Sequence, residues 1–356
     1  MSQPKKYGQP LQHLGASITL LHLRATTFGI TYGDLLQANR KGHNWASWSR
    51  ALVTFAERYE ALGCEALAQG RLISAEKWLR MTVNYYHFAQ MFQRGDAKAA
   101  CQTKCWHAFA QLAPLLEPKA QRVAIPFEGA MLPGWLRVAH PGAPCVLILG
   151  GFEFGKETEL QQVGDYFVER GLSVLTFDGP GQGEMATQLS MRGDFDVVVS
   201  AAIDHLATLD GLVDANRIGL VGISLGGYMV CRAAAQDARV AGVVSISGNF
   251  DGRAARNLAP RNQQVMAGLF GFDTLAPLFD PDGPFSLARL PQGMTQPLLL
   301  VHGSADHVVP YDQIELFQEW SHGKTDLWVL EQAEHCCFSR MEEVLPHSAD
   351  WMVEQI

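Results

Sequence analysis

A serine between two glycines, in the run Gly222-Ile223-Ser224-Leu225-Gly226, constrains the fold of this chain more than any other part of its sequence. An apolar segment of strand length precedes the run, and a segment with helical character follows it. Glycine on both sides lets a strand and a helix pass at close range, so that a tight turn lifts the serine hydroxyl above a sheet. An ordinary glycine-rich turn would show the same motif. We predict a strand-turn-helix unit with Ser224 as the candidate nucleophile.

Two later loops contain the acid and the base that a serine nucleophile needs. Asp306 follows one apolar run of strand length, and His335 follows the next. A serine hydroxyl is a weak nucleophile at neutral pH, so an imidazole must accept its proton and a carboxylate must orient that imidazole. Folds with this turn place their triad in the chain order serine, acid, histidine. We predict a triad of Ser224, His335 and Asp306, with Glu334 and Asp251 as fallback acids.

The oxyanion of such a reaction needs two backbone amides. The first is expected from Leu225, directly after the nucleophile, and the second from the loop after the strand at 145–149. We assign the second amide to Phe152, with Gly151 beside it to permit the turn. The alternative is that Gly150 and Gly151 only end a strand.

The pattern of the chain changes near residue 120. Upstream, aromatic and aliphatic residues recur every three or four positions at 45–59 and 78–92, which predicts helices whose aromatic faces form a core. Downstream, short apolar runs alternate with amphipathic segments, which predicts a mostly parallel sheet covered on both faces. We expect a helical domain over 1–120 and a catalytic domain over 121–356. The latter should include a hairpin at 121–139, a helix near 156–170 and a strand at 173–177.

Composition excludes several classes of partner. The formal net charge is −8, and no basic run is longer than the pair Lys5-Lys6, so neither nucleic acid nor an anionic membrane is expected to bind. No apolar stretch follows those lysines as in a signal peptide, and none approaches the length of a membrane span. We expect a cytoplasmic protein that acts on a small molecule.

The cysteines predict a reduced compartment and no metal. There are seven, an odd number, and they are scattered along the chain. Cys101 and Cys105 have His107 nearby, but their spacing places both on one helix face with no second pair of ligands. We read them as helix packing and expect neither a metal nor another cofactor.

Several separate segments together resemble one known superfamily. They are 74–80, 85–87, 149–151 with Lys156-Glu157, 177–184, the Ser224 turn, His302-Gly303 with Asp306, and His335-Cys336-Cys337. The chain resembles the α/β-hydrolases, and within them the group with an N-terminal helical domain that contains 2,6-dihydroxypseudooxynicotine hydrolase and fungal polyketide-shortening hydrolases. The resemblance implies a mostly parallel eight-stranded sheet flanked by helices, with the helical domain as a cap.

The same resemblance implies an activity. Members of this group hydrolyse a carbon–carbon bond beside a ketone, which implies an aromatic, ketone-bearing substrate between cap and sheet. It also implies that the helical domain can mediate a homodimer, although a monomer stays open. Candidate residues that line the substrate are Glu153, Asp251, Tyr85, Tyr86 and His87.

One segment departs from the expected pattern. The carbon–carbon hydrolases are expected to carry a further glutamate after the sixth strand, but residues 248–259 contain none. Either Asp251 replaces it, or the reaction is hydrolysis of an ester or thioester, whose leaving group needs less help from an acid. A lyase or cyclase that uses His335 as a proton shuttle, or a ligand receptor, is the alternative on the same fold.

Overall fold

The computed structural model describes residues 15–42, 44–290 and 292–356. Lys5 and Lys6, where we expect no signal peptide, lie outside the described residues. The chain divides into two compact units, with the boundary between Ala120 and Gln121.

The first unit is built from helices whose aromatic faces pack together. Asn44 and Ser47 cap the start of the longest helix by reciprocal hydrogen bonds, which satisfies N–H groups that a helix start leaves unpaired. Trp45 stacks on Phe92 with ring centroids 4.3 Å apart, so the predicted aromatic stripes do form a core. The helices are α1 (Gly15–Thr27), α2 (Tyr32–Lys41), α3 (Trp45–Ala68), α4 (Leu72–Gln90) and α5 (Gly95–Leu112).

The second unit contains an eight-stranded sheet in the order β1-β2-β4-β3-β5-β6-β7-β8. β2 runs antiparallel to β4, and the pairs from β4 through β3 to β8 are all parallel, with Leu147 opposite Leu220 and Val221 opposite Val244. The strands are β1 (Ala120–Phe127), β2 (Ala130–Arg137), β3 (Ala143–Leu149), β4 (Ser173–Phe177), β5 (Val213–Ile223), β6 (Val240–Ile246), β7 (Leu298–Gly303) and β8 (Thr325–Leu330). The predicted fold class is confirmed.

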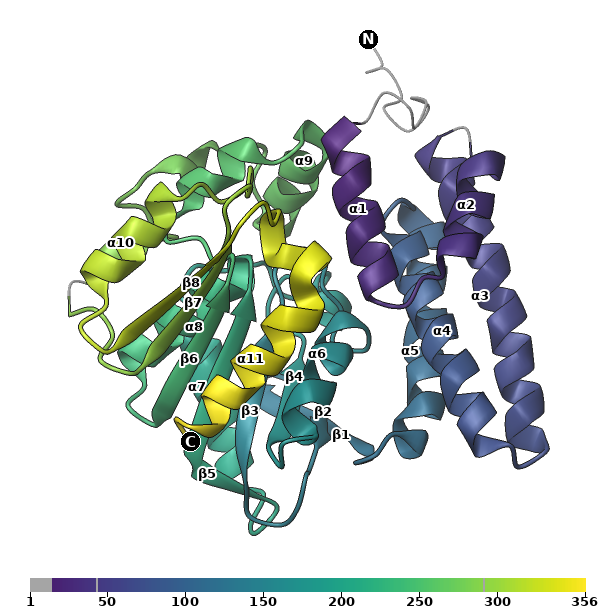
Figure 1. The fold of residues 1–356 in the computed structure, drawn as a ribbon, viewed down its shortest axis with the longest axis horizontal. Helices are drawn as coiled ribbons and strands as arrows, with labels where there is room; N and C mark the ends of the chain where they lie inside the picture. The colour runs from purple at the N-terminus through teal and green to yellow at the C-terminus, as the bar shows by residue number, and fades with distance from the viewer. Residues whose placement is uncertain (1–14, 43, 291) are drawn as a thin grey trace. The chain divides into compact units, whose positions relative to one another are not determined.

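Helices cover both faces of this sheet (Figure 1). α7 and α8 pack together on one face, whereas α6 and α11 pack together on the other. The helices of this unit are α6 (Glu159–Val168), α7 (Asp196–Ala207), α8 (Leu225–Gln236), α9 (Pro260–Leu269), α10 (Asp312–Trp320) and α11 (Met341–Val353). The helix predicted near 156–170 is therefore present but starts later, at Glu159.

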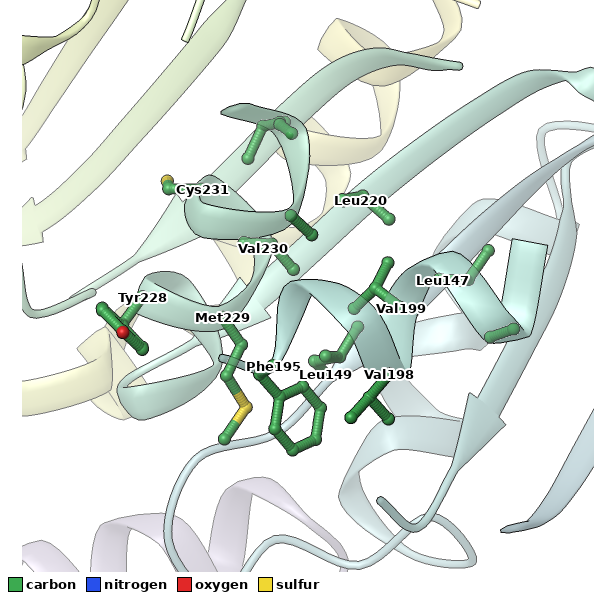
Figure 2. Packing of buried hydrophobic residues seen from close by; sticks show 14 of the residues in the cluster. Leu147, Leu149, Phe195, Val198, Val199, Leu220, Tyr228, Met229, Val230 and Cys231 are labelled. Atoms are coloured by element: carbon green, nitrogen blue, oxygen red, sulfur yellow. The ribbon is translucent and has the colours of Figure 1, made fainter. Parts of the chain in front are cut away.

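The core between the sheet and α7 and α8 fixes the helix that begins beside Ser224. Figure 2 shows Leu147 of β3 and Leu220 of β5 near Val199 of α7, with Met229 and Val230 of α8 in the same cluster. Parallel strands buried on both faces have continuous apolar sequences, as here. Because the carboxyl ends of parallel strands share one edge, the loops after β3, β5, β7 and β8 meet there.

The structure also shows the character of the helices, the grouping of metal-binding side chains and the state of the cysteines. Across the residues it describes, no helix has the length and apolar character that crossing a membrane requires. No group of three or more His, Cys, Asp or Glu side chains able to hold a metal ion is found in the described part of the chain. All seven cysteines lie in that part, and each is a free thiol.

Candidate active site

Ser224 occupies a strained turn between β5 and α8. Its φ is 58° and its ψ is −124°, a conformation that a residue with a side chain rarely adopts. A Cβ on Gly222 would lie 2.2 Å from the carbonyl oxygen of Gly226, so only glycine lets the strand and the helix pass this closely. The N–H of Ser224 donates to the carbonyl of Ile246 in β6, at 2.8 Å. The close approach of strand and helix and the hydrogen bond to β6 together fix the turn.

The three candidate triad residues form one continuous hydrogen-bonded chain. Ser224 Oγ lies 2.9 Å from His335 Nε2, and His335 Nδ1 lies 2.8 Å from Asp306 Oδ2. Asp306 comes from the loop after β7 and His335 from the loop after β8, so the sheet topology brings together residues far apart in sequence. The Asp306 side chain is fully covered, whereas Ser224 is half-buried.

Backbone contacts fix the acid and the base in place. The other carboxylate oxygen of Asp306 accepts hydrogen bonds from the N–H groups of Val308 and Val309, both at 2.8 Å. After His335 the chain turns sharply, with φ values of 66° at Cys336 and 54° at Cys337. The N–H of Cys336 donates to the hydroxyl of Ser247, at 3.0 Å, which ties the histidine loop to the end of β6.

The pKa values of Asp306 and His335 are shifted in opposite directions. Burial alone would raise the pKa of Asp306, but His335 and the Val309 N–H outweigh it and hold that pKa below its ordinary value. Burial alone would lower the pKa of His335, but the sulfur of Cys336 and the carboxylate of Asp306 outweigh it, so the pKa lies well above 6.5. A basic imidazole beside a hydroxyl is what proton removal requires.

The fallback acids make other contacts. Glu334 accepts hydrogen bonds from the N–H and the hydroxyl of Ser339, so its carboxylate caps the turn after His335. Asp251 accepts from Nε and Nη2 of Arg253 and from Nε2 of Gln313. The acid that contacts His335 is Asp306.

The loop after β3 lies directly against the serine turn. A Cβ on Gly151 would lie 2.7 Å from the Cβ of Ser224 and 3.1 Å from the Leu225 nitrogen, so this glycine is required by close approach and does more than end a strand. Phe152 follows it and packs partly on the core. Leu225 begins α8, and the first N–H groups of a helix have no partner within that helix. The two candidate oxyanion donors therefore come from segments in contact.

Two protein-family models match this chain. The model of the prolyl oligopeptidase family matches residues 160–356, and that of the esterase FrsA-like family matches residues 32–252. Each match covers more than half of the chain, and the resemblance found in the sequence is confirmed. The chain belongs to the α/β-hydrolases.

Individual relatives of this α/β-hydrolase are hydrolases of bacteria and fungi. It is 27% identical over 330 residues to 2,6-dihydropseudooxynicotine hydrolase of Paenarthrobacter nicotinovorans, a match that covers 92% of this chain and 89% of the relative. It is 33% identical over 223 residues to the hydrolyase poxO of Penicillium oxalicum. That match covers 58% of this chain and 52% of the relative, so the chain spans about half of the fungal protein.

Solved structures show the same fold over nearly the whole chain. The crystal structure of 2,6-dihydroxy-pseudo-oxynicotine hydrolase superimposes with a TM-score of 0.85 at 27% identity, covering 94% of this chain and 95% of that chain. The structure of AbyA5 superimposes with a TM-score of 0.70 at 18% identity, covering 95% and 93%, and supports the fold alone.

Residues expected to line the substrate fall into both units of the α/β-hydrolase. Glu153 follows Phe152 and has a φ of 62°, and its Oε1 lies 3.7 Å from Nη2 of Arg261 in α9. Tyr85, Tyr86 and His87 are buried on α4. The role of these residues at a substrate stays a prediction, as does that of the helical unit as a cap.

The contacts of the two tyrosines are internal to the helical unit. Tyr85 donates its hydroxyl hydrogen to Asp34, at 2.6 Å, and Tyr86 donates to Glu60, at 2.7 Å. Burial and those carboxylates raise the pKa of both phenols. These contacts give each tyrosine a structural role in the helical unit.

Sequence reasoning missed several residues that hold the site together. They are Val308 and Val309, whose N–H groups bind Asp306, Ser247, which binds the histidine loop, and Gln182, whose Nε2 donates to the carbonyl of Gly150 at 3.4 Å. Backbone partners leave no trace in sequence. The glycine-rich segment around Gln182 was visible as a motif, but nothing in it showed which loop it would contact.

Proposed function

We propose that this α/β-hydrolase acts through Ser224 as nucleophile, His335 as general base and Asp306 as the residue that orients the histidine. The observation that carries the proposal is the unbroken chain from Ser224 Oγ through both ring nitrogens of His335 to Asp306. The strained backbone of Ser224 supports it, because strain at a polar residue is typical of functional positions.

The contacts support a two-step hydrolysis. Ser224 Oγ attacks the substrate carbonyl while its proton passes to His335 Nε2, and the carbonyl oxygen takes up the negative charge. The N–H groups of Leu225 and Phe152 stabilise that charge. His335 then gives the proton to the leaving group, and a water molecule, deprotonated by His335, releases the acyl group from Ser224.

The substrate class we propose is an aromatic or polyketide-like molecule with an ester, thioester or ketone carbonyl. The names of the relatives support an aromatic substrate, since one of them acts on a pseudooxynicotine. The state of Asp251 supports an ester or thioester over a ketone: its carboxylate is already bound by Arg253 and Gln313, so it cannot readily protonate a carbanion.

Labelling with a fluorophosphonate tests the nucleophile. Intact mass should show one adduct on the wild type and none on Ser224→Ala or His335→Ala. Ser200→Ala is the matched control, because Ser200 lies on α7, where its hydroxyl donates to Asp237. We expect its labelling to equal that of the wild type. An adduct on Ser224→Ala would refute the assignment, and no adduct on any form would favour lyase or cyclase chemistry.

Product analysis then separates the two kinds of bond. Phenyl butyrate, its thioester and benzoylacetone are each incubated with the wild type and with Ser224→Ala, and the acids released are measured. Release from the ester and thioester alone supports acyl hydrolysis. Release of benzoate or acetate from benzoylacetone, dependent on Ser224, would replace it with carbon–carbon hydrolysis.

A further inference from the structure

A buried lysine lies at the end of the loop that follows β3. The ammonium group of Lys156 is fully buried and contacts three carboxylates: Glu157 at 2.5 Å, Asp178 at 2.6 Å and Glu184 at 2.7 Å. The mechanism above uses none of these four residues. Moving charged groups out of water is costly, so a buried cluster of this kind is stable only where its ion pairs have good geometry.

The cluster joins the β3 loop to a second loop. Lys156 and Glu157 end the loop after β3, whereas Asp178 and Glu184 lie at either end of the glycine-rich loop after β4. Asp178 also accepts from the N–H of Glu184 at 2.9 Å, and a Cβ on Gly183 would lie 2.1 Å from that carboxylate. The glycine-rich loop is thus folded around the carboxylate that binds the lysine.

Further hydrogen bonds fix the backbone of Lys156 and a carboxylate that its side chain contacts. Its own carbonyl accepts from the hydroxyl of Thr176 at 3.0 Å and from Nε2 of Gln161 at 3.1 Å. Glu157 accepts from the indole N–H of Trp135 at 3.1 Å. The backbone and the side chain of Lys156 are therefore both held in place.

The start of the β3 loop is bound to the same glycine-rich loop. Gln182, in the glycine-rich loop, accepts from the N–H of Gly179 at 3.0 Å and donates to the carbonyl of Gly150 at 3.4 Å. Residues 150–155 are thus anchored at Gly150 and at Lys156, with Gly151 against Ser224 between the anchors. Phe152, the proposed oxyanion donor, lies in this short anchored stretch.

We propose that Lys156 and its three carboxylates form a positioning device for the oxyanion loop, residues 150–155. The inference rests on the proposed function, because it assigns the cluster to the amide of Phe152. A donor that acts on a developing charge must already be in place when the charge forms. Displacement by about 1 Å can cost on the order of 100-fold in rate.

The test compares Lys156→Met with a matched variant, Arg137→Met. Arg137 is also buried and pairs with Asp165, but that pair joins β2 to α6. We expect Lys156→Met to slow fluorophosphonate labelling by about 100-fold, with kcat for phenyl butyrate lowered far more than KM is raised. Arg137→Met should label at close to the wild-type rate, even where its thermal midpoint is lowered as much. Equal rates for the two folded variants would overturn the inference.

Glu184→Gln provides a second variant, in case Lys156→Met fails to fold. Its side chain is a quarter exposed, so the change is milder, and we expect slowing in the same direction but smaller. A wild-type labelling rate in this folded variant would overturn the inference.

Amide hydrogen exchange separates this inference from the proposed function. We expect faster exchange at residues 150–155 in Glu184→Gln and Lys156→Met, and unchanged exchange in β8, which contributes no residue to the cluster. This readout does not depend on the serine. Unchanged exchange at 150–155 would therefore overturn the positioning role even if the wild type labels, whereas a wild type that fails to label would overturn the proposed function alone.

Discussion

Each unit of the protein contains a buried carboxylate with short hydrogen bonds to its neighbours, yet the two carboxylates have different partners. In the helical unit, one oxygen of Asp34 accepts from the hydroxyls of Tyr59 and Tyr85, both at 2.6 Å. In the sheet unit, Asp306 binds His335 and two backbone N–H groups. Burial and the carboxylate raise the pKa of both phenols, so neither gives up its proton near neutral pH.

The comparison shows how a carboxylate that joins helices differs from one that we propose to support proton transfer. Asp34 is bound by groups that keep their protons, and its contacts join α2 to α3 and α4. Asp306 is bound by an imidazole whose second nitrogen contacts a hydroxyl. Similar burial and bond lengths therefore serve stability in one unit and, as we propose, proton transfer in the other.

The largest expected effect that would break this comparison is on catalysis. Asp306→Asn should lower kcat/KM for phenyl butyrate by about 10⁴-fold, because an amide does not hold the histidine in the required tautomer. Asp34→Asn should leave the activity of each folded molecule within about twofold of the wild type, since Asp34 is part of no proton path. Comparable losses in both variants would mean that the helical unit takes part in the chemistry.

The next effect is on stability, and here the informative variant is Asp34→Asn. Asp34→Asn should lower the free energy of unfolding by about 2–3 kcal/mol, because two hydrogen bonds to a charged group are weakened. Urea denaturation measures this. Tyr59→Phe, which removes one hydroxyl, is the control and should cost about half as much. No loss in Asp34→Asn would show that the contact does not stabilise the helical unit.

The smallest effect is on the pH profile. Because the pKa of His335 lies above 6.5, the base becomes protonated as pH falls through that raised value, and it can no longer accept the proton of Ser224. The acidic limb of kcat/KM should therefore have its midpoint above pH 6.5 and fall about tenfold per unit below it. In Asp306→Asn the midpoint should move down. A wild-type midpoint below 6.5 would contradict the charge balance described here.

The sequence predicted the sheet and the order of the candidate residues because both depend on local pattern. Apolar runs of strand length identify the strands, and their parallel order places Ser224, Asp306 and His335 at one edge. Their roles stay predictions, although the structure brings the three into contact. What could not be predicted is which distant side chain each polar group binds.

Particular residues show why. The helix near 156–170 begins only at Glu159, because Gly155 to Thr158 form a turn that the Lys156 cluster holds. Asp251 is a fallback acid in the sequence, but its carboxylate binds Arg253 two residues later and Gln313 of α10, and the contact with the distant Gln313 gives no signal in the sequence. Tyr85 is a candidate lining residue in the sequence, and its hydrogen bond to the buried Asp34, 51 positions away, gives no signal there.

The parallel order of the sheet also offers a place to modify the protein. The turn at Asp210 and Gly211 is exposed, and it lies just before β5, at the amino ends of the strands. The Ser224 turn lies at the opposite edge. A fluorescent reporter or an affinity tag inserted between Asp210 and Gly211 would attach the enzyme to a support through the edge away from its chemistry, leaving the loops that carry Ser224, Asp306 and His335 undisturbed.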